Sequence, residues 1–178
     1  MWIQTFTGKK LYPLDPDPLD ICIEDIAHSL SYLCRYNGHG KFFYSVSEHS
    51  VIIAQLLERY GNLPRCAPLI GLLHDAPEGL GLCDIPSPIK PYLENYEDIE
   101  NTMMYAVLDS FRISEDDYIL CKGVVKGLDT RILMDERAEL FDKVIPWITD
   151  CEPLGVAIEC WNPEVAEKKF LEAYEKYK

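Results

Sequence analysis

Apolar residues recur at steps of three and four along most of the chain from residue 21 onward, a period that predicts amphipathic helices. The first run predicts a helix over roughly 22–36, which Asn37-Gly38 would end. Residues 45–48, Ser-Val-Ser-Glu, have the pattern of a capping box. They predict that a second helix begins there and runs to Gly61.

A third predicted helix starts at Pro64 and is apolar on all sides as far as Leu73, so we expect it to be buried. Further helices are predicted over about 95–111, from the cap Ser114 to about 142, and from Asn162-Pro163 onward. Prolines stiffen the segment 84–91 and predict an extended loop there.

Residues 1–20 have a different pattern. Strand-forming residues on both sides of segment 7–10 predict a small hairpin, and the proline-rich segment 12–19 excludes regular structure. No repeat or linker divides the rest. The sequence therefore predicts an all-α chain with one domain over 1–178, in which 21–178 form the helical core behind a short N-terminal hairpin.

Composition narrows the classes of function. A net charge of −13 argues against a nucleic-acid partner, whereas a small phosphorylated substrate needs only a local cluster of cations. The seven cysteines contain no C-x-x-C pair, which argues against a zinc ribbon and fits the reducing cytoplasm. The sequence has no run of 18 apolar residues and no signal peptide, so we expect a cytoplasmic protein without a membrane partner.

Four polar side chains interrupt the helical pattern at positions far apart in the chain: His49, His74, Asp75 and Asp129. Three of them have ordinary explanations: His74 could be stabilised by a helix dipole next to a surface Asp75, and Asp129 could form a surface ion pair with Lys126. Together, however, two imidazoles and two carboxylates would suit Mn²⁺, Fe²⁺, Co²⁺, Ni²⁺ or Zn²⁺ better than Ca²⁺ or Mg²⁺.

This order of residues resembles the HD-domain phosphohydrolase superfamily. The segments 44–50, 72–78 and 84–90 are most similar to the branch that contains the 5′-deoxynucleotidases and the short bacteriophage dATP triphosphohydrolases. The resemblance covers roughly 22–140. It implies an HD-type helical domain that binds one divalent metal through the four residues and hydrolyses deoxynucleotides.

The resemblance also implies roles for five further residues. Glu78 matches an acid that handles protons near the scissile phosphate, and Asp84 matches a carboxylate that orients the attacking water or the sugar. Arg35, Lys126 and Lys90 would bind substrate phosphate. The loop between Glu78 and Asp84 is one residue longer than in the deoxynucleotidases, which leaves the placement of Asp84 and Lys90 open.

Several alternatives stay open. The substrate could be a monophosphate, cut to deoxynucleoside and phosphate, or a triphosphate, cut to deoxynucleoside and triphosphate with a second divalent cation beside the phosphates. Base preference is open too. Other candidates are a cyclic-nucleotide phosphodiesterase, a non-catalytic nucleotide-binding protein of the same fold, and a helical adaptor, although an adaptor would not explain the four polar positions.

The remaining histidines and several aromatic side chains could line a pocket or a subunit interface. His28 could line a pocket or form a hydrogen bond in the core, and His39 is expected in a loop. Other aromatic side chains could stack on a base, although aromatics at helical spacing usually belong to the core; these are Tyr32, Tyr36, Phe42, Phe43 and Trp147. We expect a homo-oligomer, to whose interface Trp147, Trp161 and the C-terminal helix could contribute.

Overall fold

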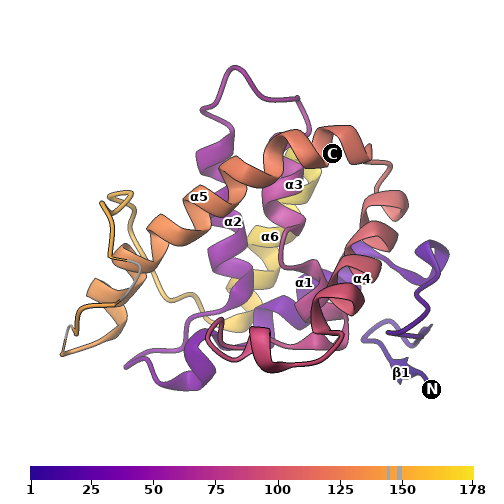
Figure 1. Cartoon of the computed structure of the whole chain (residues 1–178), viewed down its shortest axis with the longest axis horizontal. Coiled ribbons are helices and arrows are strands. Elements are labelled where there is room, and N and C mark those ends of the chain that lie inside the picture. The colour runs from indigo at the N-terminus through magenta and orange to yellow at the C-terminus, as the bar shows by residue number, and fades with distance from the viewer. Residues whose placement is uncertain (144, 148–149) are drawn as a thin grey trace.

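The computed structural model describes residues 1–143, 145–147 and 150–178. These residues are mostly helical, which confirms the predicted all-α class (Figure 1). The α-helices are α1 (Ile23–Tyr32), α2 (Val46–Leu57), α3 (Ala67–Leu73), α4 (Tyr96–Ser110), α5 (Glu115–Leu140) and α6 (Pro163–Tyr177). Short helical turns are η1 (Pro18–Asp20), η2 (Arg35–Gly38), η3 (Glu78–Leu82) and η4 (Lys90–Tyr92). Strands β1 (Ile3–Gln4) and β2 (Lys10–Leu11) pair antiparallel, as the predicted hairpin requires.

The core lies between α2, α3 and α6, with α1 packed against α6 and α5 running across α2 and α3 (Figure 1). Every residue of α3 is buried, as its apolar sequence predicts, although the helix begins at Ala67 rather than Pro64. Gly71 allows α2 and α3 to approach closely, because a Cβ at this position would overlap the side chain of Leu57. This approach places the end of α3 beside the start of α2.

The first helix is shorter than predicted and ends at Tyr32 instead of residue 36. Leu33 is extended because its carbonyl accepts a hydrogen bond from the Val46 amide at 3.1 Å, and the Arg35 amide donates to the Tyr44 carbonyl at 2.9 Å. These bonds to a distant segment compete with the helical ones. Arg35 therefore starts the turn η2 and does not belong to the last turn of a helix.

The predicted capping box is confirmed for Ser45 but not for Glu48. Ser45 accepts a hydrogen bond from the Glu48 amide at 3.0 Å and caps α2 as predicted, but the helix ends at Leu57 and not at Gly61. The Glu48 carboxylate is buried and instead accepts the backbone amides of 159–161, at 2.7, 3.0 and 2.6 Å. The segment before α6 is thereby fixed to the first turn of α2.

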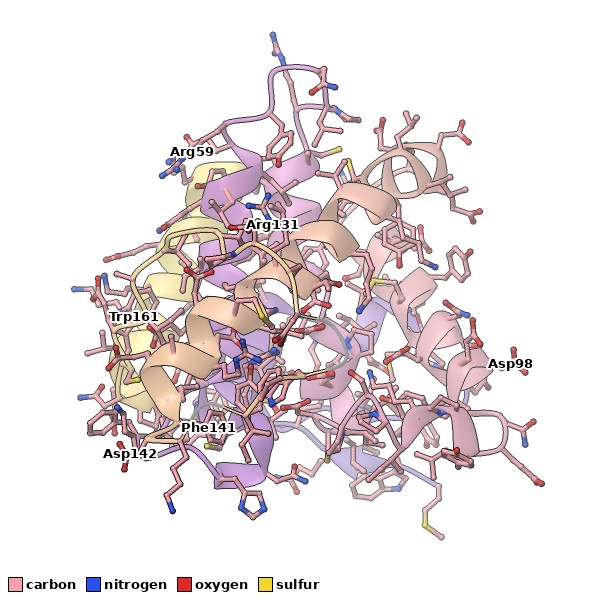
Figure 2. The ribbon with its side chains drawn as sticks, turned by 60° about the vertical axis from the view of Figure 1, so that its left-hand side comes forward. Arg59, Asp98, Arg131, Phe141, Asp142 and Trp161 are labelled. Atoms are coloured by element: carbon pink, nitrogen blue, oxygen red, sulfur yellow. The ribbon has the colours of Figure 1, made fainter. Side chains whose placement is uncertain are left out.

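The same segment is fixed to α5 as well. Arg131 of α5, labelled in Figure 2, donates to the carbonyl oxygens of Glu152 and Pro153, both at 3.0 Å. Asp135, one turn later, accepts the amides of 154–156 at 2.7, 2.8 and 3.1 Å. The connection between α5 and α6 thus holds α5 in place against the rest of the bundle.

The remaining helices agree with the sequence. Helix α4 spans Tyr96–Ser110, Ser114 caps α5 through the Asp117 amide at 3.2 Å, and Asn162 caps α6 through the Val165 amide at 2.9 Å. Residues 83–86 have no regular structure, but the predicted loop ends in the helical turn η4. Across the described ranges, no helix has the length and apolar character needed to cross a bilayer.

Candidate metal centre and its pocket

The structure brings three of the four predicted metal ligands, His49, His74 and Asp129, within 4.8 Å of one another, and Asp75 lies beside the two histidines. His49 lies in the first turn of α2, His74 and Asp75 follow α3, and Asp129 lies in the middle of α5. The Nε2 atom of His49 is 3.3 Å from that of His74 and 3.3 Å from Asp129 Oδ1. Asp75 Oδ2 lies 3.2 Å from His74 Nε2 and 3.7 Å from His49 Nε2. Asp129 thus faces the imidazoles.

Hydrogen bonds on the far side of each ring fix which nitrogen is available to a cation. His74 Nδ1 is 2.7 Å from the Gly71 carbonyl and donates to it, and His49 Nδ1 is 2.8 Å from a carboxylate oxygen of Glu136. Both Nε2 atoms can therefore present lone pairs to one point. A tetrahedral site with bonds of about 2.1 Å needs ligand atoms about 3.4 Å apart. The distances from His49 Nε2 to the other three residues and from His74 Nε2 to Asp75, 3.2 to 3.7 Å, fit that requirement.

Electrostatics favour positive charge at this point. Burial and the charge of Arg35 lower the pKa of His49, but the carboxylates of Glu136 and Asp129 outweigh them and raise it to about 9. Burial raises the pKa of Asp129, yet its hydrogen bond to His49 and the nearby imidazole charge hold it well below its usual value. A divalent cation could take the place of the proton that these carboxylates attract.

Behind His49 lies a buried network that sequence reasoning missed. Glu136 is 0% exposed, and its Oε1 accepts from His49 and from the Tyr44 hydroxyl, the latter at 2.9 Å. Its Oε2 accepts from the Tyr36 hydroxyl and from Arg35 Nη2, the latter at 3.3 Å. Burial raises the pKa of Glu136, but the charges of Arg35 and His49 lower it to about 2. Its position two helical turns after Asp129, on the same face of α5, was the available signal.

A pocket of about 280 Å³ opens onto the metal centre. Its walls include His74, Asp75 and Asp129, while His49 lies behind them and is fully buried. All residues predicted to act in catalysis or substrate binding line this pocket: Glu78, Asp84, Arg35, Lys90 and Lys126. The one-residue longer loop does not carry Asp84 or Lys90 away from it.

Glu78 is an acid of the pocket whose pKa is strongly raised. Its side chain is nearly buried, with one oxygen 3.7 Å from Lys90 Nζ, and the other has no hydrogen-bond partner in the described part of the chain. Burial, together with the negative charges of Asp75 and Asp84, raises the pKa of Glu78 to about 9. Burial also raises the pKa of Asp84. Glu78 therefore holds a proton at neutral pH.

The lysines of the pocket differ in their partners. Lys90 pairs with Glu100 at 2.9 Å, and Lys126 forms the predicted ion pair with Asp129 at 2.8 Å while its side chain stays 73% exposed. Lys122, one turn earlier on α5, also lines the pocket and was not predicted. Its spacing of four residues from Lys126 was the signal that could have identified it. The lysines of α5 thus lie at the pocket mouth.

The other histidines lie outside the pocket. His28 stacks on Phe6 with ring centroids 3.7 Å apart and forms a hydrogen bond with Glu167 at 3.0 Å. His39 follows η2 in a loop, as predicted. Among the aromatic candidates, Tyr36 contributes its hydroxyl to the Glu136 network. The ring of Trp147 lies near the ring of Tyr36, with centroids 6.0 Å apart.

Comparison with known proteins gives relatives but no activity. No family model matches the chain. The chain is 36% identical over 133 residues to an uncharacterized protein of Rhodobacter capsulatus, a match that covers 72% of this chain and 67% of that protein. It is 35% identical over 140 residues to the uncharacterized protein YfdR of Escherichia coli K12, covering 78% and 72%. The chain therefore belongs to the family that contains these two bacterial proteins.

Proposed function

We propose that the protein is a divalent-metal-dependent phosphohydrolase of the HD superfamily that cleaves deoxynucleotides at the 5′ phosphate. The convergence of His49, His74, Asp75 and Asp129 beside a cation-lined pocket supports this proposal most strongly. The donor set suits one transition-metal ion. Such an ion supplies Lewis acidity, which stabilises negative charge on a phosphoryl oxygen and favours ionisation of water.

The phosphoryl group is bound by the cations that line the pocket. The Arg35 side chain is about 10% exposed and lines the pocket, and its Nε has no hydrogen-bond partner among the described residues. A guanidinium held this way can donate to phosphoryl oxygens and stabilise the charge that develops as the bond to the leaving oxygen breaks. Lys90 and Lys126 add positive charge from two other sides.

One carboxyl group acts on the leaving oxygen and another on the attacking water. Glu78 holds a proton at neutral pH and donates it to the 5′ oxygen as the bond to phosphorus breaks. Asp84, which faces the same pocket, orients the water that attacks phosphorus. The products are the deoxynucleoside and either phosphate or triphosphate. The expected homo-oligomer, the cytoplasmic location and the second cation for a triphosphate stay predictions.

Product analysis tests the proposal. The purified protein is incubated with Mn²⁺, Co²⁺, Ni²⁺, Fe²⁺ or Zn²⁺ and a panel of deoxynucleoside mono- and triphosphates, and the products are separated by chromatography. We expect deoxynucleoside with at least one metal, and the phosphorus product identifies the substrate class. Cyclic nucleotides are included because their selective cleavage would contradict the proposal. Binding of nucleotides without turnover under every metal would also contradict it.

A further inference from the structure

The carboxylate of Glu136 has more donors around it than an ordinary buried glutamate. Two groups donate to Oε1 and two to Oε2, so both oxygens have two donors. One of these donors is a metal ligand, His49, and another is the arginine that faces the pocket. Glu136 does not line the pocket itself. Its role in the chemistry must therefore act through the residues that it holds.

We propose that Glu136 is a positioning residue that keeps the proton of His49 on Nδ1 and so leaves Nε2 free for the metal. The same carboxylate holds Arg35 beside the phosphate pocket, a second role that rests on the proposed function. The first role needs only a cation. Both can be tested separately because metal binding requires no nucleotide.

The inference follows from the number of acceptors that the network needs. Arg35 has only donors, so the atom that faces it must be an acceptor. A carboxylate offers acceptors on both sides, whereas a glutamine offers one oxygen and one NH₂ group. In Glu136→Gln the oxygen would turn to Arg35 and Tyr36, and the NH₂ group would face His49. The ring of His49 would then accept at Nδ1 and carry its proton on Nε2, where it blocks the metal.

The backbone around Arg35 is shaped for this network. Tyr36 and Asn37 both have left-handed conformations, with φ of 57° and 49°. Asparagine adopts this conformation fairly readily, but a tyrosine seldom does. This turn brings the Tyr36 hydroxyl onto Oε2 directly beside the Arg35 contact. Local strain of this kind persists only where the surrounding structure maintains it. The four donors of the network provide that support.

The experiment compares wild type with Glu136→Gln, using Zn²⁺ as the probe. Isothermal titration should show a loss of Zn²⁺ affinity of about 10- to 100-fold, the scale found for groups that orient metal-bound histidines. The chain has four histidines, so long-range ¹H–¹⁵N spectra can assign the protonated nitrogen of each ring. We expect Nδ1–H for His49 in the Zn²⁺-loaded wild type and Nε2–H in the metal-free variant. Glu139→Gln, an exposed glutamate on the same helix, should change neither result.

Several outcomes would overturn the inference. One is a Glu136→Gln protein that is folded by circular dichroism and binds Zn²⁺ within twofold of wild type. Another is a spectrum of the Zn²⁺-loaded wild type in which Nδ1 of His49 carries no proton. Should the glutamine variant not fold, Glu136→Asp keeps the charge but withdraws the carboxylate from His49, so unchanged affinity in that variant would also overturn it. Loss of Zn²⁺ affinity in Glu136→Gln, together with a wild type that turns over no nucleotide under any metal, would support the positioning role and contradict the proposed function.

Discussion

The inner end and the mouth of the pocket are built differently. At the inner end, His49 and Glu136 are fully buried and each polar atom of their side chains has a fixed neighbour. At the mouth, Lys126 is 73% exposed and Lys122 is exposed as well. Charges interact strongly where water is excluded and weakly where solvent and salt screen them. The inner end should therefore decide whether a metal binds and a reaction occurs, and the mouth should tune substrate affinity.

Asp129→Ala tests the inner end and should have the largest effect. The substitution removes one of the four proposed metal ligands and leaves His49 Nε2 without the carboxylate that lies 3.3 Å from it. We expect metal affinity to fall by more than the roughly 100-fold typical of groups outside the ligand set, and turnover to be lost with it. Titration calorimetry and phosphate release measure the two effects.

Asp116→Ala is the matched control for this variant. Asp116 is exposed in the first turn of the same helix, where its removal should cost at most about 1 kcal/mol of helix-dipole stabilisation. Metal affinity and turnover should both stay at the wild-type level. Activity that persists in metal-stripped protein would show that the inner end does not work as a metal centre.

Glu78→Gln should reduce turnover by about 10²- to 10⁴-fold, because the amide cannot donate the proton that the leaving oxygen needs. Metal affinity should change little, since Glu78 is not among the ligands. The wild-type rate should fall as pH rises through the pKa of Glu78, because the protonated form is the active one. The variant should lack this limb of the pH–rate profile, and a variant that kept it would assign the limb to another group.

Glu78→Gln, which should lower turnover, should raise the stability of the folded protein at alkaline pH. The pKa of Glu78 is raised to about 9 in the folded metal-free protein from its ordinary 4.5, so the folded state binds more protons between these values. Stability must then decrease as pH rises across that window. Glu78→Gln should flatten this decrease and raise the free energy of unfolding at pH 8 by about 1–2 kcal/mol, or roughly 2–8 °C in Tm. Thermal denaturation from pH 5 to pH 9 measures it, and an unchanged slope would contradict the assignment.

The sequence predicted the features that depend on neighbours along the chain. Caps at Ser45, Ser114 and Asn162 are local signals and all three are present. It failed where a distant partner competes with a local one. Leu33 leaves the helix because it pairs with Val46, and Glu48 binds residues 159–161 in place of its own N-cap.

The candidate site divides in the same way. His74-Asp75 at the end of an apolar helix marks a polar site from local pattern alone, and the resemblance supplied its partners. Glu136 has no local mark, because it is one of many charged residues on α5 and its donors come from segments about 90 to 100 residues earlier. Only packing shows that it is buried. Glu136, which supports His49 from behind, was thus harder to predict than the proposed metal ligands.

Lys122→Met tests the mouth and should have the smallest effect. Lys122 lies over the ring of Tyr118 at 5.7 Å from its centroid and forms no ion pair with any residue in the described ranges, so it is free to meet a phosphate. It lies one helical turn beyond Lys126, a step of about 6 Å away from the proposed metal ligand Asp129. An exposed charge of this kind contributes about 0.5–1 kcal/mol, so KM for a triphosphate should rise about two- to fivefold with kcat unchanged.

The rise in KM for the triphosphate should become smaller as salt is added, and KM for a monophosphate should not change. Lys168→Met, at an exposed lysine on α6, is the control. An equal rise in KM for both substrates would place Lys122 beside the first phosphate and remove the distinction between the inner end and the mouth.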